Sequence, residues 1–408
     1  MSLVENVVGI ISNKDNKEFE ISLYNSLSDI STPKALEIKH KNNTYYAALQ
    51  NNPPENSKVY IKINEINGTE SFVYTVESTA IILTNEKHKM SDFFEDYESK
   101  ISFANEEIKV RTETLDQCFK NCFTLEEAPM LDTSKVTSMN LMFAGDFTSE
   151  GLHTIPKKLK LKTIPLYDTS NVTNMTGMFQ NAGSIESIPL LNTSKVTSMD
   201  HLFFHSGALL YIADPQYDKT LCQGNPIETV PLLDTSNVES MEGMFGGCYK
   251  LKSIPKFNTS KVKDMSYMFL CCTSMNTIPQ LDTSNVTNMS SMFAGQDCYA
   301  LYDRAEYVYN NFTYIPELNT AKVKRMICMF QFNQALTSID WEIDCSSIEW
   351  PDSTYDNDGC AGMFEGCNAL SGVIKFKNVP ASIAHKFTKE KLGNCGTYTI
   401  EIVNTSDR

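Results

Sequence analysis

The chain has 408 residues, of which 35 are Lys or Arg and 50 are Asp or Glu, so its formal net charge is −15. This acidic balance, together with the lack of a basic run, argues against nucleic acid and anionic membranes as partners. At 41% hydrophobic residues the composition is globular, and no apolar stretch approaches the roughly 20 residues needed to span a bilayer.

The first 84 residues predict an all-β module. The segment from Ala35 (ALEIKHKNNTYYAAL) and the segment from Val59 (VYIKINEINGTESFVYTV) each contain a strand, an Asn-containing turn and an aromatic strand. Each pattern predicts a β-hairpin. The extreme N-terminus carries none of the basic, apolar and small-residue segments of a secretory signal.

The paired hairpins resemble small β modules of tail and baseplate proteins from phages that infect Firmicutes and gut bacteria. This resemblance implies that residues 1–84 attach the chain to other proteins of a virion. A phage protein leaves the cell by lysis, which would explain the missing export signal. Residues 85–114, which include DFFEDYESK, are expected to form a charged, partly helical connector and a cap.

From residue 115 onward the sequence repeats. Asp168 opens DTSNVTNMTGMF, and close variants of this phrase open at Asp234 and Asp282. Four further copies have Lys at the fourth place, and they open at Asp132, Asn192, Asn258 and Asn319. The shortest interval between copies is 24 residues, and three intervals are longer by 12, 18 and 13 residues. A period of 24 is typical of leucine-rich repeats.

Each repeat predicts one rung of a stacked structure. In the copy from Asp234, the residues Val238, Met241, Met244 and Phe245 fall at helical spacing, and Gly246 with Gly247 would end a helix of about two turns. The LKSIPKFNT segment that follows predicts a short extended stretch. No single rung can bury its apolar face, so neighbouring rungs must stack.

The repeated phrase resembles the BspA-type leucine-rich repeats of bacterial surface proteins. This resemblance implies an α/β fold, a right-handed leucine-rich-repeat-like solenoid of short strands and short helices, presented outside the cell for recognition. We assign the solenoid to residues 115–370, after the small all-β domain, and a C-terminal cap to residues 371–408. The resemblance does not imply an enzyme.

Insertions at residues 144–161, 205–228 and 294–314 follow the Met-Phe pair, and residues 341–359 form an irregular segment that we place at a similar register. Insertions at one register project from one face of a solenoid, so these loops predict a composite surface. Aromatic rings interleaved with carboxylates suit sugars or a protein partner, although the same rings could simply pack on the rungs. The candidate binding residues are Tyr211, Tyr217, Tyr299, Tyr302, Tyr307, Tyr309, Trp341, Trp350 and Tyr355.

Cysteines are expected to be mostly free core thiols. Cys122, Cys248, Cys272 and Cys367 each follow a repeat Phe by three residues, where another copy has Ala182. We expect one buried and one rim thiol at Cys271 and Cys272, whereas Cys298, Cys345 and Cys360 could form disulfides. No pair of cysteines has zinc-finger spacing, and no cofactor is expected.

A calcium hypothesis concerns the acidic loop that ends at Gly359. Its candidate ligands are Asp352, Asp356 and Asp358. Their spacing matches a calcium loop incompletely, and a solvated acidic loop is the alternative.

These observations favour a non-enzymatic recognition protein. The leading interpretation is a phage tail fibre or receptor-binding component, located in the virion, that binds a host surface glycan or protein through the solenoid and its loops. Virion fibres are often trimers, so a homotrimer is one expected assembly. The alternatives are a BspA-type adhesin on the bacterial surface, whose signal is absent from this sequence, and a polysaccharide-degrading enzyme that carries a repeat domain.

Overall fold

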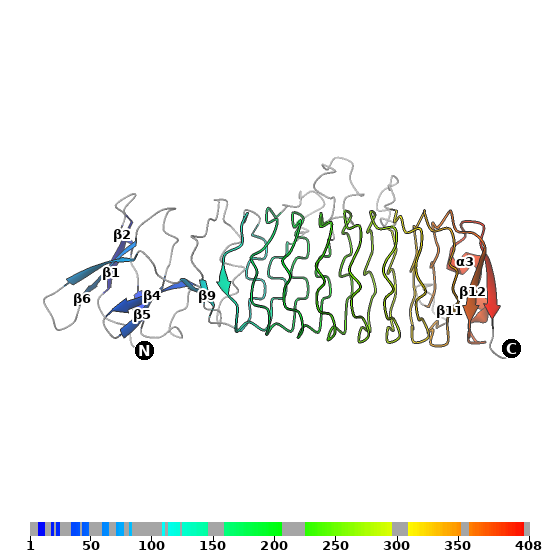
Figure 1. Ribbon diagram of the computed structural model, residues 1–408, viewed down its shortest axis with the longest axis horizontal. Coiled ribbons are helices and arrows are strands. Elements are labelled where there is room, and N and C mark those ends of the chain that lie inside the picture. Colours follow the sequence, from blue (N-terminus) through cyan, green and yellow to red (C-terminus); the bar gives the residue numbers. More distant parts are fainter. Residues whose placement is uncertain are drawn as a thin grey trace.

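The computed structural model describes strands β1 to β9 and residues 113–122, 125–145, 159–205, 225–295, 309–351 and 359–403. Figure 1 shows the early strands at one end of the molecule, a long stack of similar coils in the middle, and β12, β13 and α3 at the other end. None of the helices within these residues has the length and apolar character needed to cross a bilayer.

The N-terminal strands form two sheets. One has the order β2-β1-β6-β7, and the other has the order β10-β9-β8-β4-β5-β3. Their bounds are β1 (Val7–Ser12), β2 (Glu18–Phe19), β3 (Ser22–Tyr24), β4 (Lys34–His40), β5 (Asn43–Ala48), β6 (Val59–Asn64), β7 (Ser71–Val76), β8 (Ile81–Leu83), β9 (Ile108–Val110) and β10 (Leu131–Asp132). Antiparallel pairing of β4 with β5 and of β6 with β7 confirms both predicted hairpins.

The second sheet continues into the repeats. Strand β8 pairs antiparallel with β4 and parallel with β9, and β9 pairs parallel with β10, which lies in the first full repeat. The switch from antiparallel to parallel pairing therefore occurs at β8. Residues 84–107, which contain most of the predicted connector, lie outside the described residues.

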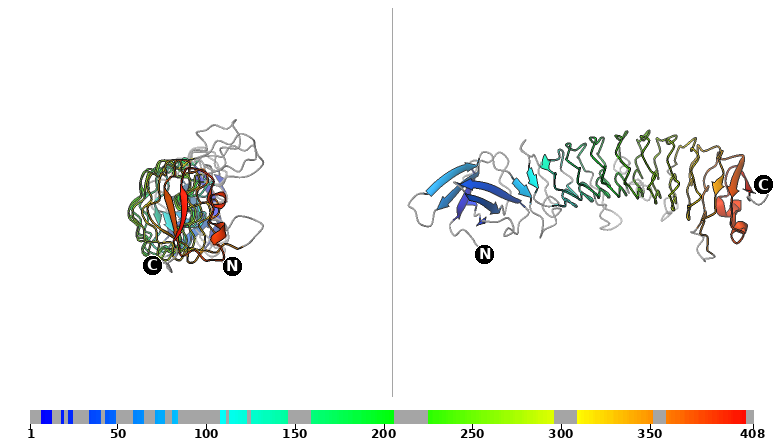
Figure 2. Two further views of the ribbon diagram at one scale, coloured as in Figure 1. Left: turned by 90° about the vertical axis from the view of Figure 1, so that its right-hand side faces the viewer. Right: turned by 60° about the horizontal axis from the view of Figure 1, so that its bottom comes forward.

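Successive coils stack in register. Single parallel bridges connect each coil to the next, from Thr114 and Ser138 through to Asn288 and Arg325. The repeat phenylalanines form a continuous phenylalanine row, with neighbouring ring centroids 5.3 to 5.9 Å apart and interplanar angles of 2 to 14°. This row consists of Phe119, Phe143, Phe179, Phe203, Phe245, Phe269, Phe293, Phe330 and Phe364. Figure 2 shows the coils nearly superposed when the molecule is viewed from its C-terminal end.

The expected short helix in each coil is wrong. Between Met241 and Gly247, every second N–H donates to the next coil, as Gly243 does to the carbonyl of Ser266 at 2.8 Å, so these groups cannot form helical bonds. The intervening residues form turns, and Gly243 has a left-handed φ of 58°. Hydrogen bonds between coils thus replace those of a two-turn helix, which is marginal on its own. The right-handed twist and the leucine-rich-repeat class of the stack stay predictions.

Two buried asparagines close two of the three coils that carry long insertions. In an uninterrupted coil, the carbonyl of Phe245 accepts the N–H of Cys248 at 2.9 Å. After an insertion, the side chain of Asn225 donates to Phe203 at 3.3 Å, and that of Asn310 donates to Phe293 at 2.9 Å. The amide side chain therefore replaces the turn N–H where the chain returns to the stack.

The structure contains one further repeat phrase, which was not predicted from the sequence. Asp344 opens DCSSI, and its Oδ1 accepts the N–H of Ser346 at 3.0 Å, as Asp234 does for Ser236. The segment that follows ends at Gly359, whose carbonyl accepts the N–H of Met326 before the Met-Phe pair begins. Our placement of residues 341–359 at the register of the other insertions is therefore wrong.

A parallel sheet and a short helix complete the last coil. Strands β11 (Ile343–Asp344), β12 (Val373–Lys377) and β13 (Thr399–Val403) pair in that order, and they are accompanied by η3 (Ala384–Lys386) and α3 (Lys389–Leu392). The N–H of Phe364 donates to the carbonyl of Leu392 at 2.7 Å, so the end of α3 supplies the partner that the next coil supplies elsewhere.

Candidate binding face of the repeat stack

Each repeat phrase begins with a turn that joins two coils. Oδ1 of the opening residue, which is the Asp or Asn that starts the phrase, accepts the N–H of the residue two positions later at 3.0 to 3.3 Å. The following Thr is buried, and its hydroxyl donates to the backbone carbonyl of the next opening residue, as Thr235 does to Asn258 at 2.8 Å. These bonds hold the opening residues in a row along the stack.

Lys and Asn alternate at the fourth place of the phrase. Asn237 donates from Nδ2 to the carbonyl of Ser194 in the preceding coil, and its Oδ1 accepts from Lys261 of the next coil at 2.6 Å. Asn171 and Asn285 make the equivalent bonds. The full alternating row is Lys135, Asn171, Lys195, Asn237, Lys261, Asn285 and Lys322. From Asn171 onward, the side chains of this row are therefore occupied by contacts between coils.

The residue two positions before each opening residue faces outward, and we call this set the outer row. Between the two lies a buried residue, such as Leu191 or Leu233, so the chain alternates exposed, buried and exposed as an extended segment does. In chain order the outer row is Met130, Leu166, Leu190, Leu232, Lys256, Gln280, Glu317 and Glu342. Its first half is apolar, and its second half is polar or charged.

The apolar half of the outer row is open to solvent. Met130 is 49% exposed, and Leu166, Leu190 and Leu232 are 66, 63 and 62% exposed. We call these four side chains the apolar stripe. Beside it runs a row of opening residues that includes Asp132, Asp168 and Asp234. Hydrogen bonds from the Ser two residues later hold the pKa of each of these carboxyls below its usual range, so all three are charged at neutral pH.

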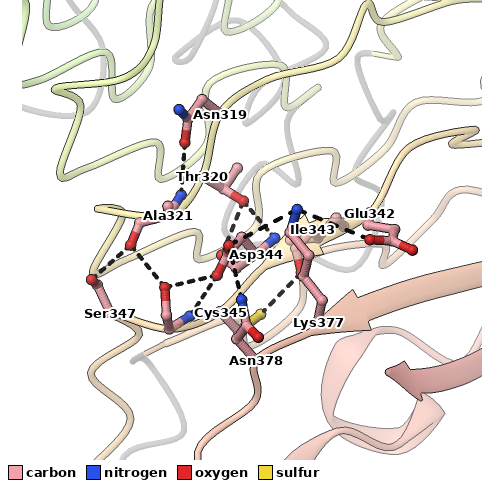
Figure 3. Close-up of polar contacts among 11 residues, drawn as sticks. Asn319, Thr320, Ala321, Glu342, Ile343, Asp344, Cys345, Ser347, Lys377 and Asn378 are labelled. Atoms are coloured by element: carbon pink, nitrogen blue, oxygen red, sulfur yellow. Dashed lines mark hydrogen bonds and ion pairs between the residues drawn. The ribbon is translucent and has the colours of Figure 1, made fainter. Parts of the chain in front are cut away.

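The polar half of the same face is hollowed into an open groove of about 530 Å³. Lys377 lies between two carboxylates there, with Nζ 4.0 Å from both Glu342 and Asp344 (Figure 3). Desolvation by burial acts to raise the pKa of Asp344, but hydrogen bonds from Ser346 and Asn378 and the charge of Lys377 outweigh it, so the pKa is lowered. The lining residues are Gln280, Leu281, Asp282, Thr283, Glu317, Leu318, Asn319, Thr320, Ala321, Glu342, Asp344 and Lys377.

Three of the nine predicted binding aromatics lie within the described residues. Trp341 is buried and donates from Nε1 to the carbonyl of Ile315 at 3.2 Å, and Trp350 is buried edge-on to Phe387 at 5.6 Å. Both tryptophans therefore pack in the core, so placing them on a binding surface was wrong. Tyr309 is half-buried with its ring edge-on to Phe332. The others lie outside the described residues: Tyr211, Tyr217, Tyr299, Tyr302, Tyr307 and Tyr355.

No disulfide joins the described cysteines. Cys122, Cys248, Cys272 and Cys367 are fully buried, which confirms the predicted core position. Burial raises the pKa of Cys248 and Cys272. Cys271 is buried beside Cys272, so the expected rim thiol is wrong. Cys345 and Cys360 are free and buried, and Cys298 lies outside the described residues.

The structure does not test the calcium hypothesis. Asp352, Asp356 and Asp358 lie outside the described residues. Among the residues that the structure does describe, no group of three or more His, Cys, Asp or Glu side chains is arranged to hold a metal ion.

The outer row was not predicted from the sequence, because binding residues were expected in the insertions. The signal was present in the repeats themselves, since the residue two positions before each opening residue reads Met, Leu, Leu, Leu, Lys, Gln, Glu and Glu. A position that changes character while its neighbours stay constant is free of the demands of packing. Such a position is a candidate for function.

One family model matches the chain, and it is described as "Mycoplasma protein of unknown function, DUF285". The match covers residues 149–210 and 222–311, all within the repeats. Comparison with curated proteins and with solved structures gave no match. The family match is consistent with a repeat protein of the BspA type, and it does not reach the N-terminal strands that carry the resemblance to phage proteins.

Proposed function

We propose that the chain is a non-enzymatic recognition protein of the bacterial cell surface, which binds a partner through the outer face of its coils. The observation that carries this proposal is the apolar stripe, because four consecutive coils expose a large apolar side chain at one register position. Contiguous exposed apolar surface on a folded protein typically marks an interaction site.

The polar residues of the repeat support a structural rather than a catalytic role for the phrase itself. Thr235 bonds to the next coil, Asp234 closes its own turn, and Asn237 links two neighbouring coils. Their recurrence is thus explained by the stacking of coils. The location at a cell surface rests on the resemblance to BspA-type repeats, with which the family match is consistent.

A narrower proposal places the same chain on a phage tail, where residues 1–84 would attach to other virion proteins. It is favoured by the pairing of β4 with β5 and of β6 with β7, the two hairpins on which that resemblance depends. The family match, which concerns a cellular organism, favours the cell surface instead.

Immunolabelling separates the two locations. Intact cells that produce the chain, and phage particles from the same culture, would be labelled with an antibody against residues 159–205 and viewed by electron microscopy. We expect label on cells, together with competition by the purified chain for adhesion of those cells to their substratum. Label confined to tail tips would establish the phage proposal, and label on neither particle would overturn both.

A further inference from the structure

The coils that carry the apolar stripe repeat at a distance close to one turn of an α-helix. The neighbouring ring centroids of Phe143, Phe179, Phe203 and Phe245 in these coils lie 5.6 to 5.9 Å apart, and we take this distance as the step from one stripe residue to the next. One turn of an α-helix rises about 5.4 Å, whereas same-side residues of an extended strand lie roughly 6.8 Å apart. A helix laid along the stack can therefore place one apolar residue per turn against each of the four coils. The same-side residues of a strand are too far apart to match successive coils.

The stripe also has a defined length. Leu232 is its last member, and the next coil has Lys256 at the same position, followed by Gln280. Four coils cover three steps of the stack, or roughly 17 Å, which corresponds to about three turns of an α-helix. This length suits a short amphipathic segment rather than an extended surface.

Three carboxylates on one side of the stripe favour a partner with basic residues. Asp132, Asp168 and Asp234 open the phrases that follow Met130, Leu166 and Leu232, whereas the neutral Asn192 follows Leu190. Residues two apart in an extended segment lie roughly 7 Å from one another. The positive charges of Lys135 and Lys195 act on Asp132 and Asp168, so three carboxylates and two lysines adjoin the stripe. An apolar row beside a carboxylate row is complementary to a helix whose apolar ridge is flanked by Lys or Arg. A second copy of this chain, with its net charge of −15, would bring like charge to this face.

We infer that the apolar stripe and its adjoining carboxylates bind a short amphipathic helix with a basic flank, contributed by a partner protein. The inference rests on the proposed recognition function and gives it a class of partner. The helix lies along the stack, and its apolar residues contact Met130, Leu166, Leu190 and Leu232. Its basic residues pair with Asp132, Asp168 and Asp234.

The test uses the full chain and a defined probe. A fluorescent peptide with Leu at helical spacing and Lys on the adjacent positions is titrated with the protein at about 150 mM salt, and binding is read by anisotropy. A second peptide has Glu in place of every Lys. We expect the Lys peptide to bind and to gain helical circular dichroism, and the Glu peptide to bind at least tenfold more weakly.

Substitutions show whether the stripe is the site. The double variant Leu166→Ser/Leu190→Ser keeps the net charge of the wild type, so a loss of binding cannot come from weaker attraction of a cationic peptide. We expect its affinity to fall at least tenfold. Gln280→Ser, at the same position in a polar coil, is the matched control and should bind like the wild type. Equal melting temperatures would show that all three proteins are folded.

Three results would overturn the inference. One is unchanged affinity in the double variant, and another is equal binding of both peptides. The last is a dimer in sedimentation experiments that the double variant abolishes, because the stripe would then bind a second copy. If the double variant still competes for cell adhesion as the wild type does, the proposed function stands and only the helix is rejected. Peptide binding by a chain that is absent from the cell surface would reject the proposed function alone.

Discussion

Within the same coils, the buried Phe stays the same from coil to coil, whereas the residue of the outer row changes. Inside, each of the nine coils presents a Phe to its neighbours, and the ring spacing varies by only 0.6 Å. Outside, the outer row changes from Leu232 to Lys256 between adjacent coils. Side chains that pack against copies of themselves must stay the same, whereas side chains that meet solvent are free to differ. Recognition is therefore expected at positions where the repeat varies.

The largest effect is expected from a charge placed inside. Phe245→Asp would bury a carboxylate between Phe203 and Phe269 and remove three stacked contacts, the third with Phe257, at a cost of about 5 kcal/mol of unfolding free energy. Chemical denaturation of the purified chain measures this. Lys256→Asp, on the outer row, should change the unfolding free energy by less than about 0.5 kcal/mol. Similar costs for the two variants would contradict the assignment of inside and outside.

The second test concerns the return of an inserted loop to the interior. The Asn310 side chain donates to Phe269, Phe293 and Ala294 at 3.0, 2.9 and 2.9 Å. Asn310→Ala leaves buried carbonyls with fewer partners, so we expect a loss of about 2 to 3 kcal/mol in unfolding experiments. The exposed neighbour is the control, because Asn311→Ala removes only a surface bond to Thr273. An effect at Asn311 as large as that at Asn310 would argue against this role.

A glycine tests the fit between one coil and the next. Gly243 has a φ of 58°, and a Cβ built there would lie 2.8 Å from Cδ2 of His201 in the preceding coil. Gly243→Ala should therefore cost about 1 to 2 kcal/mol. If the contact with His201 causes part of this loss, the double variant His201→Ala/Gly243→Ala should cost less than the sum of the single variants. Strictly additive costs in a thermal unfolding cycle would assign the loss to backbone strain alone.

A smaller effect on stability is expected from substitution of an opening residue, which lies between the buried Thr and the exposed outer row. The pKa of Asp234 is lowered by hydrogen bonds from Ser236, so its contribution to stability is present above the pKa of the unfolded chain. This contribution is lost as pH falls through the lower pKa of the folded state. Asn serves as the opening residue at Asn192 and Asn258. Asp234→Asn should therefore keep the turn. Below about pH 4, the unfolding free energy of this variant should fall less with decreasing pH than that of the wild type, by a few tenths of a kcal/mol.

This acid effect is checked by unfolding both proteins between pH 2 and pH 7. Asn258→Asp is the reciprocal control, and its unfolding free energy should fall more steeply at low pH. An unchanged pH dependence in Asp234→Asn would mean that the lowered pKa has no counterpart in stability.

The smallest effect on stability, together with a gain in peptide affinity, is expected at Lys256, where the outer row changes from apolar to charged. Lys256→Leu would extend the apolar stripe by one coil and should leave the unfolding free energy within about 0.5 kcal/mol of the wild type. The affinity for a Lys peptide lengthened by one turn should rise severalfold. No gain with the longer peptide would show that the bound helix does not extend past Leu232.

The spacing of residues within the repeat was enough to predict which side chains are buried, but not the backbone conformation. The spacing of Val238, Met241, Met244 and Phe245 identified the buried side chains, and all four are fully buried. The same spacing suggested a helix, because periodicity in a sequence cannot reveal that the N–H of Gly243 bonds to the next coil. Two hairpins were predictable because their strands and turns are adjacent in sequence.

The candidate site could be predicted only in part. Trp341 and Trp350 were assigned to the surface because they lie in irregular segments, yet the core accommodates irregular segments near its C-terminal end. The outer row could have been recognised by comparing coils, whereas the groove beside Lys377 could not, because β12 reaches the stack from outside the repeated phrase.

The alternation of Lys and Asn has a consequence for how such a gene can change length. Removing one coil would place two lysines or two asparagines on neighbouring coils. A bond such as that from Lys261 to Asn237 could then not form between those two coils. Removing two coils would restore the order. Duplication and deletion of repeats should therefore be tolerated in pairs, so the heritable unit of this stack is two coils long.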